Sequence, residues 1–587
     1  MHSKRIAIVL AVLAAAAGCS PKPAAPAGGA AAELSRLADE YFDQVYFHYA
    51  PSNATQLGLH QYDTQLEDYS RATVDRETAD LQRFQSKFGM IPAAQLDLTS
   101  QGDLQLLLAN IHSTLLSLNT VRFWEKDPDQ YSSGITSGAF VLMERNFASP
   151  DDRLRSLVAR EKLMPAVLED AHQNLKNPPR IYTEIALEQL PDIISFFQSD
   201  VPTAFQEARN EEVKREFSQT NGAVVAALKD YQSWLKTDVL PRSHGDFRFG
   251  AETYSKKLLY DEMVDTPLPQ LLEIGLADLH KNQAEFQRIA SEIDPHLKPR
   301  EVLAELTHDH PAPDRLLQSF RDTFQGLVQF IQEKHIVDIP SPARPTVAVT
   351  PPFMRATTTA SMDTPGPFEK AATAAYFFVT VPESTEKPQQ IEELMAEFNR
   401  GTIISTAVHE AYPGHYIQFL YLPQAPSRVR KVLGAASNAE GWAHYCEQMM
   451  LEQGYGQPGA GARDARDAEM IHLGQLQDAL LRDARFIVGI KMHTGGMTFD
   501  QAVNFFVDEG YQSHAGGLVE TKRGTTDATY LYYTLGKLQI LKLRADLEKQ
   551  EGARFSLEQF HDDFLKQGYP PIKIVRRALL GDASPTL

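Results

Sequence analysis

Residues 408–418 read Val408-His409-Glu410-Ala411-Tyr412-Pro413-Gly414-His415-Tyr416-Ile417-Gln418. This stretch places two imidazoles and one carboxylate between segments of helical pattern. Imidazole nitrogen is a usual protein ligand of zinc, and a carboxylate beside a ligating histidine can take a proton from metal-bound water. The stretch therefore predicts one half of a hydrolytic metal site.

The spacing of the two histidines requires a broken helix. In the zinc-peptidase signature H-E-x-x-H the histidines lie at i and i+4 on one helix face. Here His415 follows His409 by six residues, about 120° around an ideal helix. Pro413 lacks an N–H and its ring collides with the carbonyl of His409, while Gly414 tolerates unusual backbone angles. We expect His409 and Glu410 on the last turn of one helix and His415 turned back toward them. The spacing alone leaves open two unrelated histidines at a helix end.

A candidate for the third ligand lies on the next helix. Glu440, His444 and Glu447 fall at i, i+4 and i+7, so they share one helix face. Glu440 is interpreted as a metal ligand, with a capping box formed with Ser437 as the alternative. Glu447 is a candidate for orienting a ligating histidine, or else a solvated residue. His444 is a candidate ligand, substrate contact or core residue.

Both segments closely resemble a bacterial family called domain of unknown function 885, many of whose members look like lipoproteins. The family in turn resembles the gluzincin metallopeptidases, which hold zinc with two histidines and a downstream glutamate. The resemblance implies one zinc ion bound by His409, His415 and Glu440, with Glu410 as general base.

The same resemblance implies further site residues toward the C-terminus. It favours His493 and Tyr533 as catalytic donors to a developing oxyanion and adds Arg485 as a candidate, with Tyr530 and Tyr532 as weaker alternatives. The chain departs from the family just before Tyr533, at residues 526–529.

The N-terminus is typical of a bacterial lipoprotein signal. Lys4 and Arg5 precede an apolar run, and Ala16-Ala17-Gly18-Cys19 forms a small-residue cleavage site. Residues 1–19 are thus predicted to be a signal peptide whose lipobox cysteine, Cys19, carries the lipid. This predicts an exported envelope protein, on the periplasmic face of the outer membrane, attached to the membrane through lipid. A plain cleavable signal is the alternative. Residues 20–33 are predicted to be a flexible tether, and Cys446 a core residue.

Composition and pattern predict a large, mainly α-helical protein. The 587 residues are 43% hydrophobic and carry a net charge of -19, which argues against nucleic-acid binding. We expect an N-terminal helical lobe over residues 34–340 and a catalytic metal-binding lobe over 341–587, intertwined as one two-lobed body. Helices are expected over residues 151–175, 202–235, 267–293 and 313–335.

A small sheet is expected immediately before the metal helix. Residues 346–350 and 374–381 are β-rich runs, and an edge strand beside a metal site can pair with an extended peptide. The leading hypothesis is a zinc metallopeptidase anchored in the envelope and acting on peptides. One alternative is a zinc-dependent amidase or esterase acting on a small amide or other non-peptide envelope substrate. Another is a binding lipoprotein without turnover.

Overall fold

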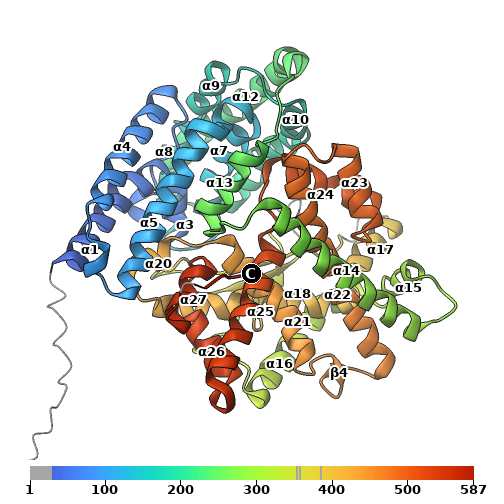
Figure 1. Ribbon diagram of the computed structural model, residues 1–587. Helices are drawn as coiled ribbons and strands as arrows, with labels where there is room; N and C mark the ends of the chain where they lie inside the picture. Colours follow the sequence, from blue (N-terminus) through green and yellow to red (C-terminus); the bar gives the residue numbers. More distant parts are fainter. Residues whose placement is uncertain (1–28, 352–354, 356–358, 384–386, 583) are drawn as a thin grey trace, which may run out of the picture.

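The computed structural model describes residues 29–351, 355, 359–383, 387–582 and 584–587. It is mainly α-helical, as predicted, with a small mixed sheet (Figure 1). The predicted signal peptide with Cys19 lies outside the described residues, as do residues 20–28 of the predicted tether. Helix α1 begins at Ala30, so the end of the predicted tether is helical. Within the described residues, no helix is both long enough and apolar enough to span a bilayer.

The N-terminal part consists of helices that build two cores. One core involves the helices from α7 to α12, and the other involves α1, α4 and α5. The main helices of this part are α1 (Ala30–Tyr41), α4 (Arg71–Gly89), α5 (Leu98–Leu116), α7 (Asp129–Met143), α8 (Pro150–Glu161), α9 (Met164–Asn174), α10 (Arg180–Ser195), α12 (Glu211–Trp234), α13 (Gly250–Glu262), α14 (Leu268–Ile293) and α16 (Leu316–Lys334).

Two of the expected helices differ from the structure in their limits, for local reasons. The helix expected over 151–175 is divided into α8 and α9, with Pro165 in the first turn of α9, where its missing N–H costs nothing. The helix expected over 202–235 is divided into α11 (Val201–Ala204) and α12, and α12 begins at Glu211 because the Asn210 side chain accepts hydrogen bonds from the backbone N–H groups of residues 212 and 213. The expectations for α14 and α16 agree within a few residues.

The C-terminal part forms the largest core together with α16. Its helices are α17 (Pro388–Glu397), α18 (Arg400–Glu410), α19 (His415–Tyr421), α20 (Arg428–Val432), α21 (Ala436–Glu452), α22 (Ala465–His493), α23 (Phe499–Asp508), α24 (His514–Thr526), α25 (Tyr532–Glu551), α26 (Leu557–Leu565) and α27 (Ile572–Leu580).

The two parts interlock across the predicted border at residue 340. Helices α13 and α14 pack against α22, and α14 runs alongside it in Figure 1. Val429, Leu433 and Ile574 from the C-terminal part complete the core around α1 and α5. Burial of apolar surface therefore links the two parts, and α22 is covered by helices from both.

The sheet lies close to the end of α18. Its strands are β1 (Thr346–Val349), β2 (Ala360–Asp363) and β3 (Tyr376–Val379), in the order β1-β3-β2, with β1 parallel and β2 antiparallel to β3. The two expected strands are present as β1 and β3. Strand β2 was not predicted, since Ala-Ser-Met-Asp carries no β-branched or aromatic residue. Because β3 pairs on both sides, residues 376–379 offer no free edge for a peptide, and the edge strands are β1 and β2.

Candidate metal centre

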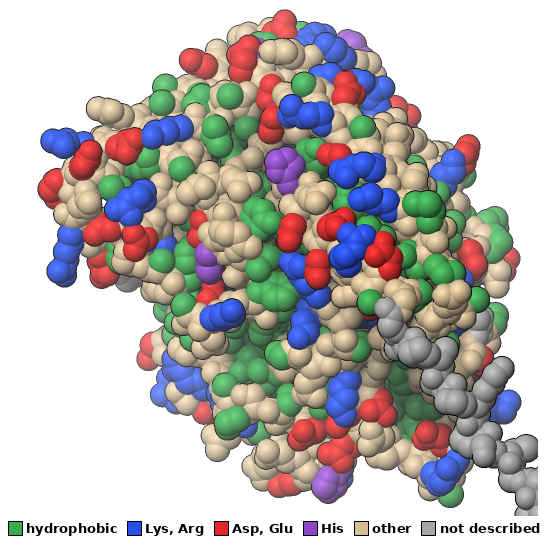
Figure 2. All heavy atoms as spheres, turned by 90° about the vertical axis from the view of Figure 1, so that its left-hand side faces the viewer, with side chains coloured by type: hydrophobic (Ala, Val, Ile, Leu, Met, Phe, Trp, Pro, Cys, Tyr) green, Lys and Arg blue, Asp and Glu red, His purple; other side chains and the backbone are tan. Residues whose placement is uncertain are grey.

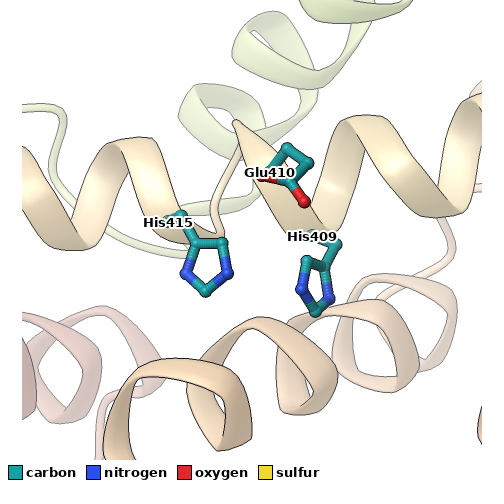
Figure 3. A group of neighbouring side chains, drawn as sticks. All are labelled: His409, Glu410 and His415. Atoms are coloured by element: carbon teal, nitrogen blue, oxygen red, sulfur yellow. The ribbon is translucent and has the colours of Figure 1, made fainter. Parts of the chain in front are cut away.

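The break predicted between His409 and His415 is present, and it is very short. Helix α18 ends at Glu410, a cis peptide joins Tyr412 to Pro413, and α19 begins at His415. Gly414 has an ordinary φ of -68°, but a Cβ there would lie 1.8 Å from the carbonyl oxygen of His409. Glycine is thus required here by this close approach of the backbone. Figure 3 shows both imidazoles on the same side of the broken helix.

Helix α21 supplies the third candidate ligand. Ser437 lies inside the helix, whose N-cap is Ala435, and its N–H donates to the Glu262 carboxylate at 3.0 Å. The capping-box alternative for Glu440 is therefore wrong. Glycines at positions 441 and 536 allow α21 to lie directly against α25, since a Cβ on Gly441 would be 2.5 Å from the Cα of Gly536.

The structure brings the three predicted ligands together. The Glu440 Oε2 atom lies 3.3 Å from Nε2 of His409 and 3.5 Å from Nε2 of His415. The two imidazole rings are nearly perpendicular, with centroids 4.8 Å apart. The side chains of His409, His415 and Glu440 are 9%, 23% and 28% exposed, so the cluster is reached from solvent on one side.

These distances fit a four-coordinate zinc ion. Zinc bonds of about 2.0–2.1 Å in a tetrahedron place neighbouring ligand atoms about 3.3–3.4 Å apart. Both distances from the Glu440 carboxylate are close to this value. Glu410 is the remaining member of the cluster, because one of its carboxylate oxygens lies within 4.8 Å of ligand atoms on His409 and His415. The cluster therefore offers two carboxylates, Glu410 and Glu440, beside the two imidazoles.

A second set of polar groups contacts His409 at Nδ1, the ring nitrogen that does not face Glu440. The Glu447 carboxylate lies 2.7 Å from Nδ1 of His409 and 3.0 Å from Nδ1 of His444. The Arg482 guanidinium completes this group, 3.1 Å from Glu447. A carboxylate on Nδ1 holds the proton there, which leaves Nε2 of His409 as the nitrogen that faces the cluster. Glu447 thus contacts both histidines, and its position suits the orienting role expected for it.

Burial and neighbouring charges shift the pKa values of the side chains in the cluster. Burial raises the pKa of Glu440, but His415 and His409 outweigh this and hold it well below its usual value. Burial lowers the pKa of His409, yet hydrogen bonds to Glu440 and Glu447 raise it to about 10. Burial lowers the pKa of His444 to about 3, which keeps it neutral. The two carboxylates therefore stabilise positive charge at the position of the His409 ring.

Glu410 also connects the cluster to the sheet. Its Oε2 atom accepts a hydrogen bond from the backbone N–H of Met362, at 3.3 Å, on the edge strand β2. The Thr380 N–H donates to the Thr359 carbonyl, and this register turns the backbone groups of Met362 away from β3. The edge of the sheet therefore faces the cluster directly.

Two of the predicted residues near the C-terminus do not belong to the cluster. His493 is buried at the end of α22, where its Nε2 lies 2.7 Å from the Gly524 carbonyl oxygen. It stands eleven residues beyond Arg482 on the same helix, about 16 Å away. Arg485 forms a two-point ion pair with Glu520, at 2.7 and 2.8 Å.

Tyr533 lies behind the cluster, at the start of α25. Its ring is packed beneath the guanidinium groups of Arg482, Arg485 and Arg523, and its hydroxyl accepts from Arg523 at 3.3 Å. Tyr530 is fully buried in a separate core, and the Tyr532 hydroxyl donates to Asp527 at 2.8 Å. Of the proposed oxyanion donors, Tyr533 is thus the one connected to the cluster, through Arg482.

Sequence reasoning missed Arg482 and Glu262. Arg482 lies one helical turn from Arg485 on α22, so the i, i+3 spacing was a usable signal for it. Glu262 ends α13, more than 170 residues before the helix that it caps, and no local pattern connects the two. Cys446 is fully buried, as predicted for a core residue.

Replacing Glu447 with glutamine is expected to weaken zinc binding about 10–100-fold, the usual effect of losing a carboxylate that orients a ligating histidine. The protein is also expected to lose about 3–5 kcal/mol of stability, because Arg482 is left buried without its closest anionic partner. Chelator competition and thermal unfolding measure the two effects. Glu452→Gln, at the exposed end of the same helix, is the matched control. Unchanged zinc affinity in Glu447→Gln would contradict the orienting role.

Replacing Glu262 with glutamine is expected to change how stability depends on pH. Burial raises the pKa of Glu262 to about 7 from 4.5. The folded state therefore binds the proton more tightly, and stability from this group is present below pH 4.5 and lost as the pH rises through 7. Between pH 5 and 8 the parent should lose about 3 kcal/mol relative to Glu262→Gln. Urea unfolding at both pH values tests this, and parallel pH profiles would contradict it.

The fold and the cluster define a mainly α-helical protein with a candidate metal centre made of two histidines and one glutamate at a broken helix and a second glutamate from α21. The chain belongs to the family described as "Bacterial protein of unknown function (DUF885)", whose model matches residues 51–579. A search among curated proteins finds no match.

Two solved structures are similar over nearly the whole chain. One is described as a "putative lipoprotein of unknown function" from Shewanella oneidensis, with 26% identity and a TM-score of 0.78 over 93% of this chain and 99% of the other. The second is a "putative lipoprotein" from Colwellia psychrerythraea, with 17% identity and a TM-score of 0.77 over 94% and 99%. The likeness to the second concerns the fold alone.

Proposed function

We propose that this protein is a zinc-dependent metallopeptidase of gluzincin type, anchored in the cell envelope. The observation that carries the proposal is the position of the Glu440 carboxylate, within 3.3 and 3.5 Å of Nε2 of His409 and His415. These three side chains would hold one zinc ion. When bound there, zinc supplies Lewis-acid polarisation of a carbonyl and lowers the pKa of a coordinated water.

Glu410 is the proposed general base. Its carboxylate lies within 4.8 Å of ligand atoms on both histidines, while Glu440 is assigned here as the third ligand. From there it can accept a proton from a water held at the cluster and return it to the leaving amine. The hydrogen bond from Met362 holds the carboxylate in this orientation.

The edge strand β2 is the proposed element of substrate recognition. A peptide lying along β2 would be aligned by main-chain hydrogen bonds, with its backbone passing beside Glu410. Such pairing makes few demands on the substrate sequence. Tyr533 is retained as the candidate donor to the oxyanion, because Arg482 links it to the cluster. His493 is not proposed, since it is bonded elsewhere.

Two alternative functions make different predictions. A zinc-dependent amidase or esterase would cleave small amides or esters and leave peptides intact, whereas a binding lipoprotein would cleave neither. Incubation with a peptide library and a panel of amides and esters, followed by mass spectrometry, distinguishes the three. The positions of cleavage in the peptides would further distinguish the two kinds of peptidase. An exopeptidase removes residues only from one end of each peptide, whereas an endopeptidase cleaves internal bonds.

Lipid attachment at Cys19 is part of the proposal. The lipobox at residues 16–19 and the description of the Shewanella oneidensis neighbour as a lipoprotein support it. Cys19→Ser is expected to abolish association with the envelope membrane, because the acceptor of the lipid is lost. Fractionation of cells expressing the parent and the variant measures this. Continued sedimentation of the variant with membranes would show that another anchor exists.

A further inference from the structure

Two large hydrophobic side chains project from the connection between α4 and α5. Met90, directly after α4, is 76% exposed, and Leu98, the first residue of α5, is 49% exposed. Ile91 and Leu96 lie between them and are buried in the core that includes α1. The connection is therefore fixed to the core by Ile91 and Leu96, while Met90 and Leu98 are exposed to solvent.

This connection lies where the described chain begins. A hollow of about 550 Å³ joins the two, lined by Gly29, Ala30 and Leu37 on one side and by Met90 and Ile91 on the other. Gly29, where the described chain begins, therefore lies beside the exposed Met90. Met90 lines this hollow and Leu98 follows it by eight residues, and exposed hydrophobic side chains near each other in the chain can belong to an interaction surface.

The charged groups around this connection are balanced within the protein. Arg36 pairs with Glu33 at 2.7 Å, and Lys87 lies 3.5 Å from Glu40. Figure 2 shows the face of the molecule that contains α1 and α4, where acidic and basic side chains are interspersed. Such a surface offers little attraction to a charged partner, so contact would depend on the apolar side chains.

The position of the proposed lipid anchor indicates which partner would contact these exposed side chains. Cys19 precedes Gly29 by ten residues, and ten residues span at most about 36 Å. A lipid on Cys19 would thus keep the connection between α4 and α5 close to the bilayer at all times. At that short range a weak apolar contact becomes effective, since tethering raises the local concentration of the surface.

We propose that Met90 and Leu98 form a membrane-docking surface that inserts into the bilayer carrying the Cys19 lipid. The contact holds the helical body in one orientation to the membrane instead of leaving it to rotate on its tether. It rests on the lipid anchor and is independent of the metal chemistry. Because the nearby charges are paired, the contact is insensitive to salt.

The test uses spin labels on the complete lipidated chain in vesicles of phosphatidylethanolamine and phosphatidylglycerol. Met90→Cys and Leu98→Cys each introduce an accessible thiol, while the native Cys446 is fully buried. Val519→Cys, on α24, is the control, because Val519 is a similarly exposed hydrophobic residue at 64%. The unsubstituted chain, treated with the same reagent, corrects for any label on Cys19.

Labels at positions 90 and 98 are expected to be more accessible to oxygen than to a water-soluble nickel complex, at low and at high salt. The label at 519 is expected to show the reverse. Aqueous accessibility at 90 and 98 in vesicle-bound protein would overturn the proposal and leave a lipid tether only. Failure of the chain to sediment with the vesicles would overturn it as well.

Discussion

Replacing Glu410 with glutamine is expected to reduce peptide hydrolysis by about 10²–10⁴-fold, the range that a general base contributes. Glutamine has nearly the same shape but cannot accept the proton. It can still receive the hydrogen bond from the Met362 N–H, so the loop between α18 and α19 should keep its geometry. Bound zinc and thermal stability are therefore expected to stay at the parental level.

The measurement compares single-turnover and steady-state rates on a peptide cleaved by the parent, with zinc content determined on the same samples. Glu393→Gln is the control, because Glu393 is exposed on α17, where its carboxylate accepts a hydrogen bond from Gln389 one turn before it. An unchanged rate of hydrolysis in Glu410→Gln would contradict the proposed role of Glu410 as the general base. Loss of zinc together with activity would instead assign it a ligand role.

Replacing either His415 or Glu440 with alanine is expected to remove zinc from the protein. The parent should hold about one ion per chain, and each variant should lose affinity by more than the roughly 10–100-fold typical of outer-sphere partners. The reason is that zinc would be held by three protein ligands, and two remaining ligands bind it much more weakly. Elemental mass spectrometry on protein prepared without added chelator measures the content directly.

Glu452→Ala is the matched control for Glu440→Ala, because both glutamates lie on α21 and Glu452 stands at its exposed end. Retention of zinc in both ligand variants would reject this cluster as the metal site. Absence of metal from the parent, in carefully prepared protein, would favour the binding-lipoprotein alternative. Circular dichroism of each variant separates loss of metal from loss of fold.

Local sequence was sufficient for the features that depend on neighbours along the chain. The helix break between His409 and His415 follows from Pro413 and from the collision that its ring makes four residues back. The face shared by Glu440 and Glu447 follows from helical periodicity. The mainly helical class follows in the same way, from apolar spacing over long segments.

The tertiary structure decided everything that depends on contacts between distant segments. Glu440 could be a ligand or a cap by its sequence, and only the Glu262 carboxylate, which occupies the Ser437 N–H, removed the second possibility. In the same way β2 became the edge strand beside Glu410 because β3 pairs on both sides. The spacing of apolar residues along the sequence predicts neither contact.

His493 shows that residue type and position on a helix do not by themselves predict whether a side chain reaches the cluster. It shares α22 with Arg482, and its residue type suits catalysis, yet the length of the helix carries it about 16 Å past the cluster and into an aromatic core. The sequence by itself thus determined which side chains could bind a metal. Which of them meet is determined by the packing of α18, α21 and α22, because apolar burial between helices sets their relative positions.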